Sequence, residues 1–289
     1  MKSPLLLALL LALCASNLSA QDLPVQRRPI QVLLVAGGCC HDYATQTQLI
    51  KEGIEKRIHA RVTVEFNPST EKNFQFRVYS KPGWAKDYDV IIHDECTAAV
   101  KDKEYVDRIL EAHRQGVPAV NLHCAMHSFR WGEYQQPVAD GADNAGWYEM
   151  IGLQSTRHGP RTPIEIEFAD SGSPIITGMK DWKTTDEELY NNVRIFDSAK
   201  ALAYGRQMQP PRKAELKKNP DAKPKEAKSV VVWTNEFGPK KTRIFSTTLG
   251  HTNETVGDER YLDLITRGVL WASANLNDDG QPAAGYGPK

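Results

Sequence analysis

The sequence predicts an α/β protein built around a mostly parallel β-sheet with helices on both of its faces. Three short segments, residues 30–36, 89–93 and 118–122, are almost entirely apolar, which is typical of strands covered on both sides. Segments with the 3.6-residue apolar spacing of a helix, residues 45–59 and 102–114, follow the first two of them. Buried strands that alternate with helices indicate a parallel sheet with crossover helices.

The first half of the chain supplies the clearest elements. The strand at residues 30–36 ends at a pair of glycines, and a second strand is predicted at residues 62–66 because its side chains alternate in polarity. Residues 68–83 form an irregular connection. Gly116 acts as a breaker before the central strand at residues 118–122. This order of elements is β-α-β-β-α-β.

The second half is less regular. We predict a helix at residues 147–151, an outer strand at 164–168, adjacent strands at 199–205 and 229–234, a last strand at 243–249, and a closing helix at 258–275. Residues 209–228 hold seven basic residues, three acidic residues and four prolines, so a solvated, mobile loop is predicted there, with a docking patch as the alternative. Residues 276–289 are predicted to be a flexible tail after a single domain at residues 30–275.

Length and charge limit the functional classes. The chain has 289 residues, 40% of them hydrophobic, and 36 basic residues balance 36 acidic ones. That length supports one large core. Non-specific nucleic-acid binding needs a basic face, and a neutral chain does not predict one, so no nucleic-acid partner is expected.

The N-terminus resembles a secretory signal peptide. Lys2 precedes an apolar run at residues 5–13 and a close of small and polar residues, which predicts a signal at residues 1–20 and a short linker at 21–29. A lipoprotein signal at Cys14 is the less favoured alternative, because Leu13 stands where a lipobox takes Gly or Ala. The run is too short for a membrane span, so we expect an exported protein, periplasmic or secreted.

Removal of this signal leaves four cysteines: Cys39, Cys40, Cys96 and Cys124. Each lies at a predicted strand end, so at least three are expected to cluster. In an oxidising compartment one disulfide that braces the loops is predicted, and a thiolate ligand or nucleophile is the alternative.

Polar side chains follow several of the predicted strands. His41 follows the first strand, Glu95 the third, His123 and His127 the central one, and His251 the last. Because parallel strands point their carboxyl ends to one edge, these side chains should share one crevice. Imidazole and carboxylate groups bind a divalent metal, with Zn²⁺ as the default, and they also serve as a metal-free acid/base set. His59 and His113 are assigned to surface or capping positions.

Several segments of the chain form a specific series, namely VLLVAGGCCHDY, DVIIHDE, VNLHCAMHSFRW, DEELYN and FSTTLGHTNE followed by RYLDLITRGVLWA. With these segments in this order, the chain resembles the ThuA-like (trehalose utilisation) family. The resemblance implies a flavodoxin-like, class I glutamine amidotransferase-like three-layer sandwich. Glutamine hydrolysis is not expected, because Cys124 lies in His-Cys-Ala and no His-x-Glu pair follows near the chain end.

What the resemblance implies for function is carbohydrate metabolism. We expect an exported hydrolase or lyase that acts on a glycoside or a 3-keto-glycoside. A keto group at C3 acidifies the proton at C2, which a histidine can remove while the glycosidic oxygen leaves. No nucleotide cofactor is expected; a carbohydrate is the expected partner, and a homo-oligomer is compatible with the sequence.

Roles follow from that expectation. The candidate catalytic residues are His123, His251, Glu95 and His41. The candidate metal ligands are His123, His251 and His158. Substrate contacts are expected from Glu188, Tyr190, His127, Arg130 and Trp131. The alternatives are a non-catalytic carbohydrate-binding or accessory protein with the same crevice, and histidines that hold a metal for structure only.

Overall fold

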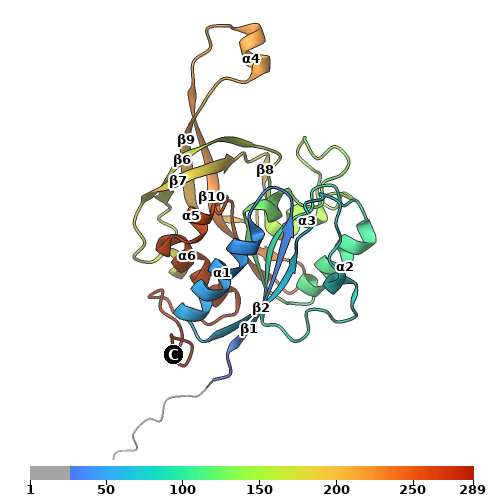
Figure 1. The fold of residues 1–289 in the computed structure, drawn as a ribbon, viewed down its shortest axis with the longest axis vertical. Coiled ribbons are helices and arrows are strands. Elements are labelled where there is room, and N and C mark those ends of the chain that lie inside the picture. Colours follow the sequence, from blue (N-terminus) through green and yellow to red (C-terminus); the bar gives the residue numbers. More distant parts are fainter. Residues whose placement is uncertain (1–26) are drawn as a thin grey trace, which may run out of the picture.

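The computed structural model describes residues 27–289, and Figure 1 shows their arrangement. The predicted signal peptide, its alternative at Cys14, and residues 21–26 of the predicted linker lie outside these residues. Among the helices of the described part, none has the length and apolar character needed to cross a membrane.

One nine-stranded sheet organises the fold, in the order β2-β1-β3-β4-β11-β10-β9-β6-β7. Its first half is parallel and contains β2 (Ala60–Asn67), β1 (Ile30–Gly38), β3 (Val90–Cys96), β4 (Ala119–Leu122) and β11 (Thr242–Thr247). When these five strands are numbered 1 to 5 along the chain, their order in the sheet is 2-1-3-4-5, which is the order of the flavodoxin-like fold. The predicted α/β sandwich of the flavodoxin-like, glutamine amidotransferase-like type is therefore confirmed.

The second half of the sheet is antiparallel. It contains β10 (Lys225–Phe237), β9 (Lys200–Gln209), β6 (His158–Phe168) and β7 (Trp182–Tyr190). The strands predicted at 164–168, 199–205 and 229–234 are all present, each as part of a longer strand. A separate two-stranded sheet joins β5 (Leu153–Gln154) to β8 (Arg194–Ile195).

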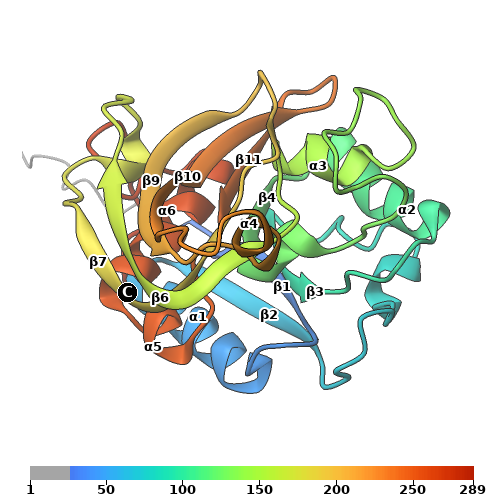
Figure 2. The ribbon, with the colours of Figure 1, turned by 90° about the horizontal axis from the view of Figure 1, so that it is seen from above.

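Helices cover both faces of the parallel half, as Figures 1 and 2 show. On one face lie α1 (Tyr43–Arg57), α5 (Asn253–Val256) and α6 (Glu259–Ala272); on the other lie α2 (Lys103–Arg114) and α3 (Gly146–Ile151). Strand β1 is buried between them: Val32 and Leu34 belong to the core under α1 and α6, whereas Leu33 and Val35 belong to the core under α2 and α3. This explains why the strand is apolar at every position from Val32 to Ala36.

Three short 3₁₀ helices complete the elements, namely η1 (Arg77–Ser80), η2 (His123–His127) and η3 (Pro174–Ile176). Of these, η2 begins directly after the central strand β4, so it turns the chain at the carboxyl edge of the sheet.

Two predictions about mobile segments are corrected. Residues 209–228 are not one loop: β9 ends at Gln209, α4 (Lys213–Lys218) follows, and β10 begins at Lys225, so an ordered arm projects from the body (Figure 1). The tail is attached to the domain, because the His59 amide donates to the Tyr286 carbonyl at 2.9 Å and the Ala283 amide to the Asn275 carbonyl at 2.8 Å. Backbone partners of this kind are not visible in composition.

The glycine pair at the end of β1 is required by close backbone packing. Gly37 and Gly38 have φ values of 142° and 101°, which side-chain-bearing residues rarely adopt. A Cβ atom on Gly38 would overlap the carbonyl oxygen of Cys96, and one on Gly37 would overlap that of Asn67. The pair therefore lets β1 end tightly between its two neighbours and turn into the loop that carries Cys39, Cys40 and His41.

Candidate functional site

A pocket of about 340 Å³ lies where the parallel strands end. That volume falls within the range of small-molecule sites. Its lining comes from the loop after β1, the end of β3, η2, and the neighbouring ends of β6 and β7, and comprises Cys39, Cys40, His41, Lys72, Cys96, Ala98, Cys124, His127, Arg130, Thr156, Arg157, His158, Glu188, Tyr190 and His251. The predicted convergence at the carboxyl edge thus brings together His41, His127 and His251.

His123 lies directly behind this lining. It is buried, and its φ of 34° is a left-handed conformation that a residue with a side chain rarely adopts. Its Nδ1 is 2.6 Å from the Thr248 carbonyl, an acceptor, so Nδ1 carries the proton and Nε2 has a free lone pair. That Nε2 is 3.3 Å from the Tyr190 hydroxyl and 3.4 Å from His251 Nδ1.

His41 completes a group of three imidazoles. Its Nδ1 faces the His251 carbonyl at 3.3 Å, so Nε2 is the unprotonated nitrogen, and this Nε2 lies 3.2 Å from Cys124 Sγ. The ring centroid of His41 lies 4.8 Å from those of both His123 and His251. The three rings therefore come from three different strand ends and face one point.

Glu188 lies at the centre of the histidines. Its carboxylate oxygens are 3.4 Å from His251 Nδ1, 3.7 Å from His123 Nε2 and 3.5 Å from His158 Nδ1. Burial acts to raise the pKa of Glu188, but the hydrogen bond from His251 and the nearby histidines outweigh it, so this pKa is below its ordinary value. The group is a carboxylate at neutral pH and can orient an imidazole.

The buried imidazoles are neutral. Burial, followed by the neighbouring His251, lowers the pKa of His41 to about 4. Burial also holds the pKa of His123 and His127 well below the usual value. Neutral imidazoles offer lone pairs to a proton or to a cation at pH 7.

The three histidines fit a divalent metal. One nitrogen from each of His41, His123 and His251 lies within 4.8 Å of the others. The 3.4 Å between His123 Nε2 and His251 Nδ1 is close to the roughly 3.3 Å expected between two ligands of tetrahedral zinc. The carbonyl of Thr248 behind His123 supplies the outer hydrogen bond that such ligands normally have. His158, predicted as a ligand, instead contacts Glu188 at the pocket mouth, with 43% of its side chain exposed.

Glu187 holds the turn that carries His251, and sequence reasoning missed it. Its carboxylate accepts from the amides of His251 at 2.8 Å and Gly250 at 3.2 Å. Burial raises its pKa. Two adjacent glutamates in a strand place one carboxylate on each face of the sheet. The pair Glu187 and Glu188 was therefore a signal that a carboxylate has a role on each face of this strand.

Besides His123, two predicted site residues lie outside the pocket lining. Trp131 packs against the core on the α2 side, and Glu95 is buried on that same face of the sheet. The reason for Glu95 is the period of the strand: Cys96 points into the pocket, so its neighbour points to the opposite face. Glu95 Oε1 lies 3.0 Å from His93 Nδ1 and accepts from the Tyr79 hydroxyl at 2.9 Å.

His113 belongs to the same buried network, so its assignment to the surface was wrong. Its Nδ1 donates to the Val117 carbonyl at 2.7 Å, and its Nε2 lies 3.0 Å from His93 Nε2. Burial, followed by the charge of His93, lowers the pKa of His113 to about 3. His113 follows Ile109 and Leu110 at helical spacing, so the apolar stripe of α2 was the signal that its side chain is buried.

This depressed pKa predicts acid sensitivity. The unfolded chain binds a proton at His113 below pH 6.5 and the folded chain does not, so stability is lost as the pH falls from 6.5 towards 3. Between pH 6.5 and 5 the free energy of unfolding should fall by about 2 kcal/mol more in the wild type than in His113→Asn, which can keep the bond to Val117. Urea unfolding at several pH values measures this, and parallel pH profiles would contradict it.

The cysteines cluster, but the disulfide differs from the predicted brace. Cys39 and Cys40 are joined to each other, so the bond does not link two loops. Cys96 and Cys124 are free and buried. The hydrogen bond with Cys96, and then burial, hold the pKa of Cys124 well above its usual value, which favours the thiol, and its Sγ lies 3.2 Å from His41 Nε2.

Known proteins share this architecture. A ThuA-like protein from Parabacteroides merdae superposes with a TM-score of 0.59 at 18% sequence identity, covering 89% of this chain and 98% of that one. A ThuA-like protein from Bacteroides uniformis gives a TM-score of 0.57 at 14% identity, covering 91% of this chain and 98% of that one. At these identities the likeness concerns the fold.

Sequence comparison extends the likeness beyond the fold. No curated protein sequence matches this chain. The sequence model of one family, described as trehalose utilisation, matches residues 31–272, which include every strand end of the pocket. The chain therefore belongs to the ThuA family.

Proposed function

We propose that this protein is an exported enzyme of carbohydrate metabolism that cleaves a glycoside or 3-keto-glycoside by hydrolysis or elimination. The observation that carries the proposal is the Glu188 carboxylate, which lies within 3.4 to 3.7 Å of nitrogens of His123, His158 and His251 in one pocket. A carboxylate that holds histidine side chains in a fixed orientation is an arrangement that supports general acid/base catalysis. The description of the family, trehalose utilisation, supports a sugar as the substrate.

His251 is the base in this proposal. When its Nδ1–H donates to Glu188, Nε2 is unprotonated and faces Arg161 Nη1 at 3.4 Å, so the substrate has to reach Nε2 in place of that arginine. The imidazole takes the proton from C2 of a keto-sugar, and the electron pair moves towards the C3 oxygen. Glu188 stabilises the imidazolium that forms.

His158 is placed to serve the leaving group. Its Nδ1 faces the Gly159 carbonyl at 2.8 Å, which leaves Nε2 for proton transfer at the exposed mouth. It would protonate the departing glycosidic oxygen, so that the bond between C1 and that oxygen breaks as the double bond between C1 and C2 forms.

Binding of a divalent cation is an alternative use of these histidines, because His251 cannot donate its Nδ1–H to Glu188 while the same Nδ1 binds a cation. His41, His123 and His251 would hold it, and when bound it would supply Lewis-acid polarisation of the C3 carbonyl. Tyr190, whose ring stacks on His127 with a 4.0 Å centroid distance, would contact the sugar beside it.

Arg130 supports negative charge that develops on the substrate. Its guanidinium is fixed by the His127 carbonyl at 2.7 Å and the Thr156 carbonyl at 3.0 Å, and no carboxylate pairs with it among residues 27–289. Lys72 and Arg157 line the same pocket. A fixed cation without a counter-ion suits an enediolate or another anionic group.

Arg130→Gln should therefore lower kcat by about 10²-fold on a 3-keto-glycoside, since it removes one fixed donor from the developing charge. Steady-state kinetics measure this. Arg206→Gln, which alters an exposed arginine paired with Glu167 and Glu226, is the matched control and should leave kcat unchanged. Equal kinetics for both variants would exclude the role of Arg130.

The test of the proposed function is a substrate screen on the whole protein. Several 3-keto-glycosides and their parent glycosides are incubated with the enzyme, and chromatography follows the released sugar and any unsaturated keto-sugar. Turnover that is lost in Glu188→Gln supports the proposal. Binding by calorimetry without turnover would favour the non-catalytic carbohydrate-binding alternative, and neither binding nor turnover would refute both. N-terminal sequencing of protein recovered from outside the cytoplasm tests export and cleavage after Ala20.

A further inference from the structure

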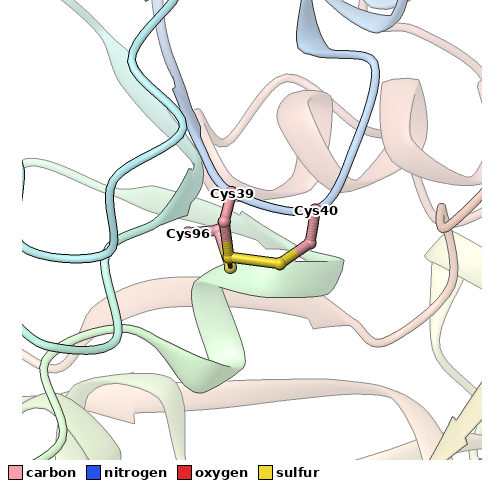
Figure 3. Close-up of side chains that lie close together, drawn as sticks. All are labelled: Cys39, Cys40 and Cys96. Carbon is pink, nitrogen blue, oxygen red and sulfur yellow. Dashed lines mark hydrogen bonds between the residues drawn. A yellow bond between two sulfur atoms is a disulfide. The ribbon is translucent and has the colours of Figure 1, made fainter.

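Three sulfur atoms lie together at one wall of the pocket, apart from the acid/base residues. Figure 3 shows Cys39, Cys40 and Cys96 turned towards one another, with the disulfide between the first two. Cys96 Sγ is 3.5 Å from Cys39 Sγ, and all three sulfurs lie within 4.8 Å of one another. None of them is needed for the proposed sugar chemistry.

The backbone explains why these sulfurs meet. Strands β1 and β3 are parallel neighbours in which Gly38 pairs with Cys96, so the residue after Gly38 lies beside the end of β3. Cys40 has a φ of 89°, an unusual left-handed value, and this turns the chain so that two consecutive cysteines face the same way. The cluster thus joins Cys96 on β3 to Cys39 and Cys40 in the turn that directly follows β1.

The spacing of the sulfurs suits a metal ion. Metal–sulfur bonds of about 2.3 Å in a tetrahedral site place the sulfurs about 3.8 Å apart, close to the 3.5 Å between Cys39 and Cys96. Cys39 and Cys96 are buried, whereas Cys40 is exposed, so an ion could enter from the pocket side. Thiolate donors select soft cations.

We propose that Cys39, Cys40 and Cys96 form a redox-gated binding site for a soft, thiophilic cation. In the disulfide state two of the three sulfurs are bonded to each other and the site is closed. A dithiol reductant supplies two electrons and two protons to the Cys39–Cys40 bond and becomes a disulfide; a phosphine supplies the two electrons and becomes a phosphine oxide, while water supplies the two protons and the oxygen. In both cases two thiols result. The three thiols then release their protons as they bind the cation.

Cadmium is a suitable probe, because its bonds to thiolates absorb in the ultraviolet and its bonds to histidine do not. The whole protein is prepared with and without phosphine reduction under nitrogen, and Cd²⁺ is added to each preparation. Reduction should raise the number of titratable thiols by two. The reduced protein should then bind one equivalent of Cd²⁺ with charge-transfer absorption, and the oxidised protein should show none.

Two variants separate this site from the histidine site. Cys96→Ser should weaken cadmium binding by about tenfold or more and reduce the charge-transfer absorption, because one thiolate is lost. The double variant His123→Ala/His251→Ala should keep the absorption, since it removes only imidazoles. Circular dichroism establishes that each variant is folded.

Three results would overturn the proposal. The first is reduced protein without charge-transfer absorption, and the second is equal absorption before and after reduction. The third is Cys96→Ser with the affinity and absorption of the wild type. If Cys96→Ser does not fold, the comparison of reduced and oxidised wild type still decides, because it needs no substitution.

Discussion

Replacing His251 with alanine is expected to lower kcat/KM for a 3-keto-glycoside by about 10³-fold. The variant removes the pocket imidazole whose Nδ1 lies 3.4 Å from the Glu188 carboxylate. It leaves the arginine and lysine side chains of the pocket in place, so substrate binding should weaken much less than turnover. Steady-state kinetics with the substrate found in the screen give both values.

The control for this prediction is another histidine of the same chain. His59 lies beside the Gly285 carbonyl, away from the pocket, and His59→Ala should retain full activity. Glu188→Gln and the double variant with His251→Ala should be about as impaired as His251→Ala, because the two residues act as one unit. Additive losses would contradict the pairing. Elemental analysis of the same preparations shows whether a metal leaves with the histidine.

The largest expected effect on stability comes from Gly38→Ala. The new Cβ would overlap the Cys96 carbonyl oxygen, and the φ of 101° would be strained for alanine in any case. Either β1 moves away from β3 or the backbone changes conformation, and both lose hydrogen bonds at the centre of the sheet. We expect the free energy of unfolding to fall by about 4 kcal/mol, as measured by urea denaturation.

The variant Gly141→Ala measures the cost of a positive φ without steric overlap, so it serves as the control for Gly38→Ala. Gly141 also has a positive φ, of 69°, but a Cβ there would meet no atom within 4 Å. We expect this control to lose only about 1 kcal/mol. A loss in Gly38→Ala as small as in the control would show that the end of β1 tolerates a side chain.

The sequence predicted best where position along a strand decided the answer. His41 and His251 lie at the pocket because each follows a parallel strand, and hydrophobic patterns reveal where such strands end. The prediction for Glu95 was wrong because successive side chains of a strand point to opposite faces of the sheet. A shift of one residue along the strand therefore places a side chain on the other face. Glu188 and Tyr190 reach the site from an antiparallel strand, and strand ends alone did not predict that placement; the family resemblance did.

Other features depended on tertiary contacts or on local backbone geometry, which the residue types alone do not reveal. The network of His93, His113 and Glu95 joins a helix to the interior of the sheet, and neither segment shows it alone. The joining of Cys39 to Cys40 follows from a local turn whose φ values are not encoded in the residue types. The arm around α4 has the composition of a loop, because its charged side chains face solvent even where its backbone is paired.

The pocket also has a consequence for how the protein acquires activity as it folds. His41 and His251 contact each other across 210 residues of chain, and Glu188 arrives from the far half of the sheet. Closing loops of that length is slow, and it requires both halves of the sheet to be in register before the histidines meet. Ligand binding should therefore be among the last properties to appear during refolding, and neither half of the chain, if separated, should retain any part of it.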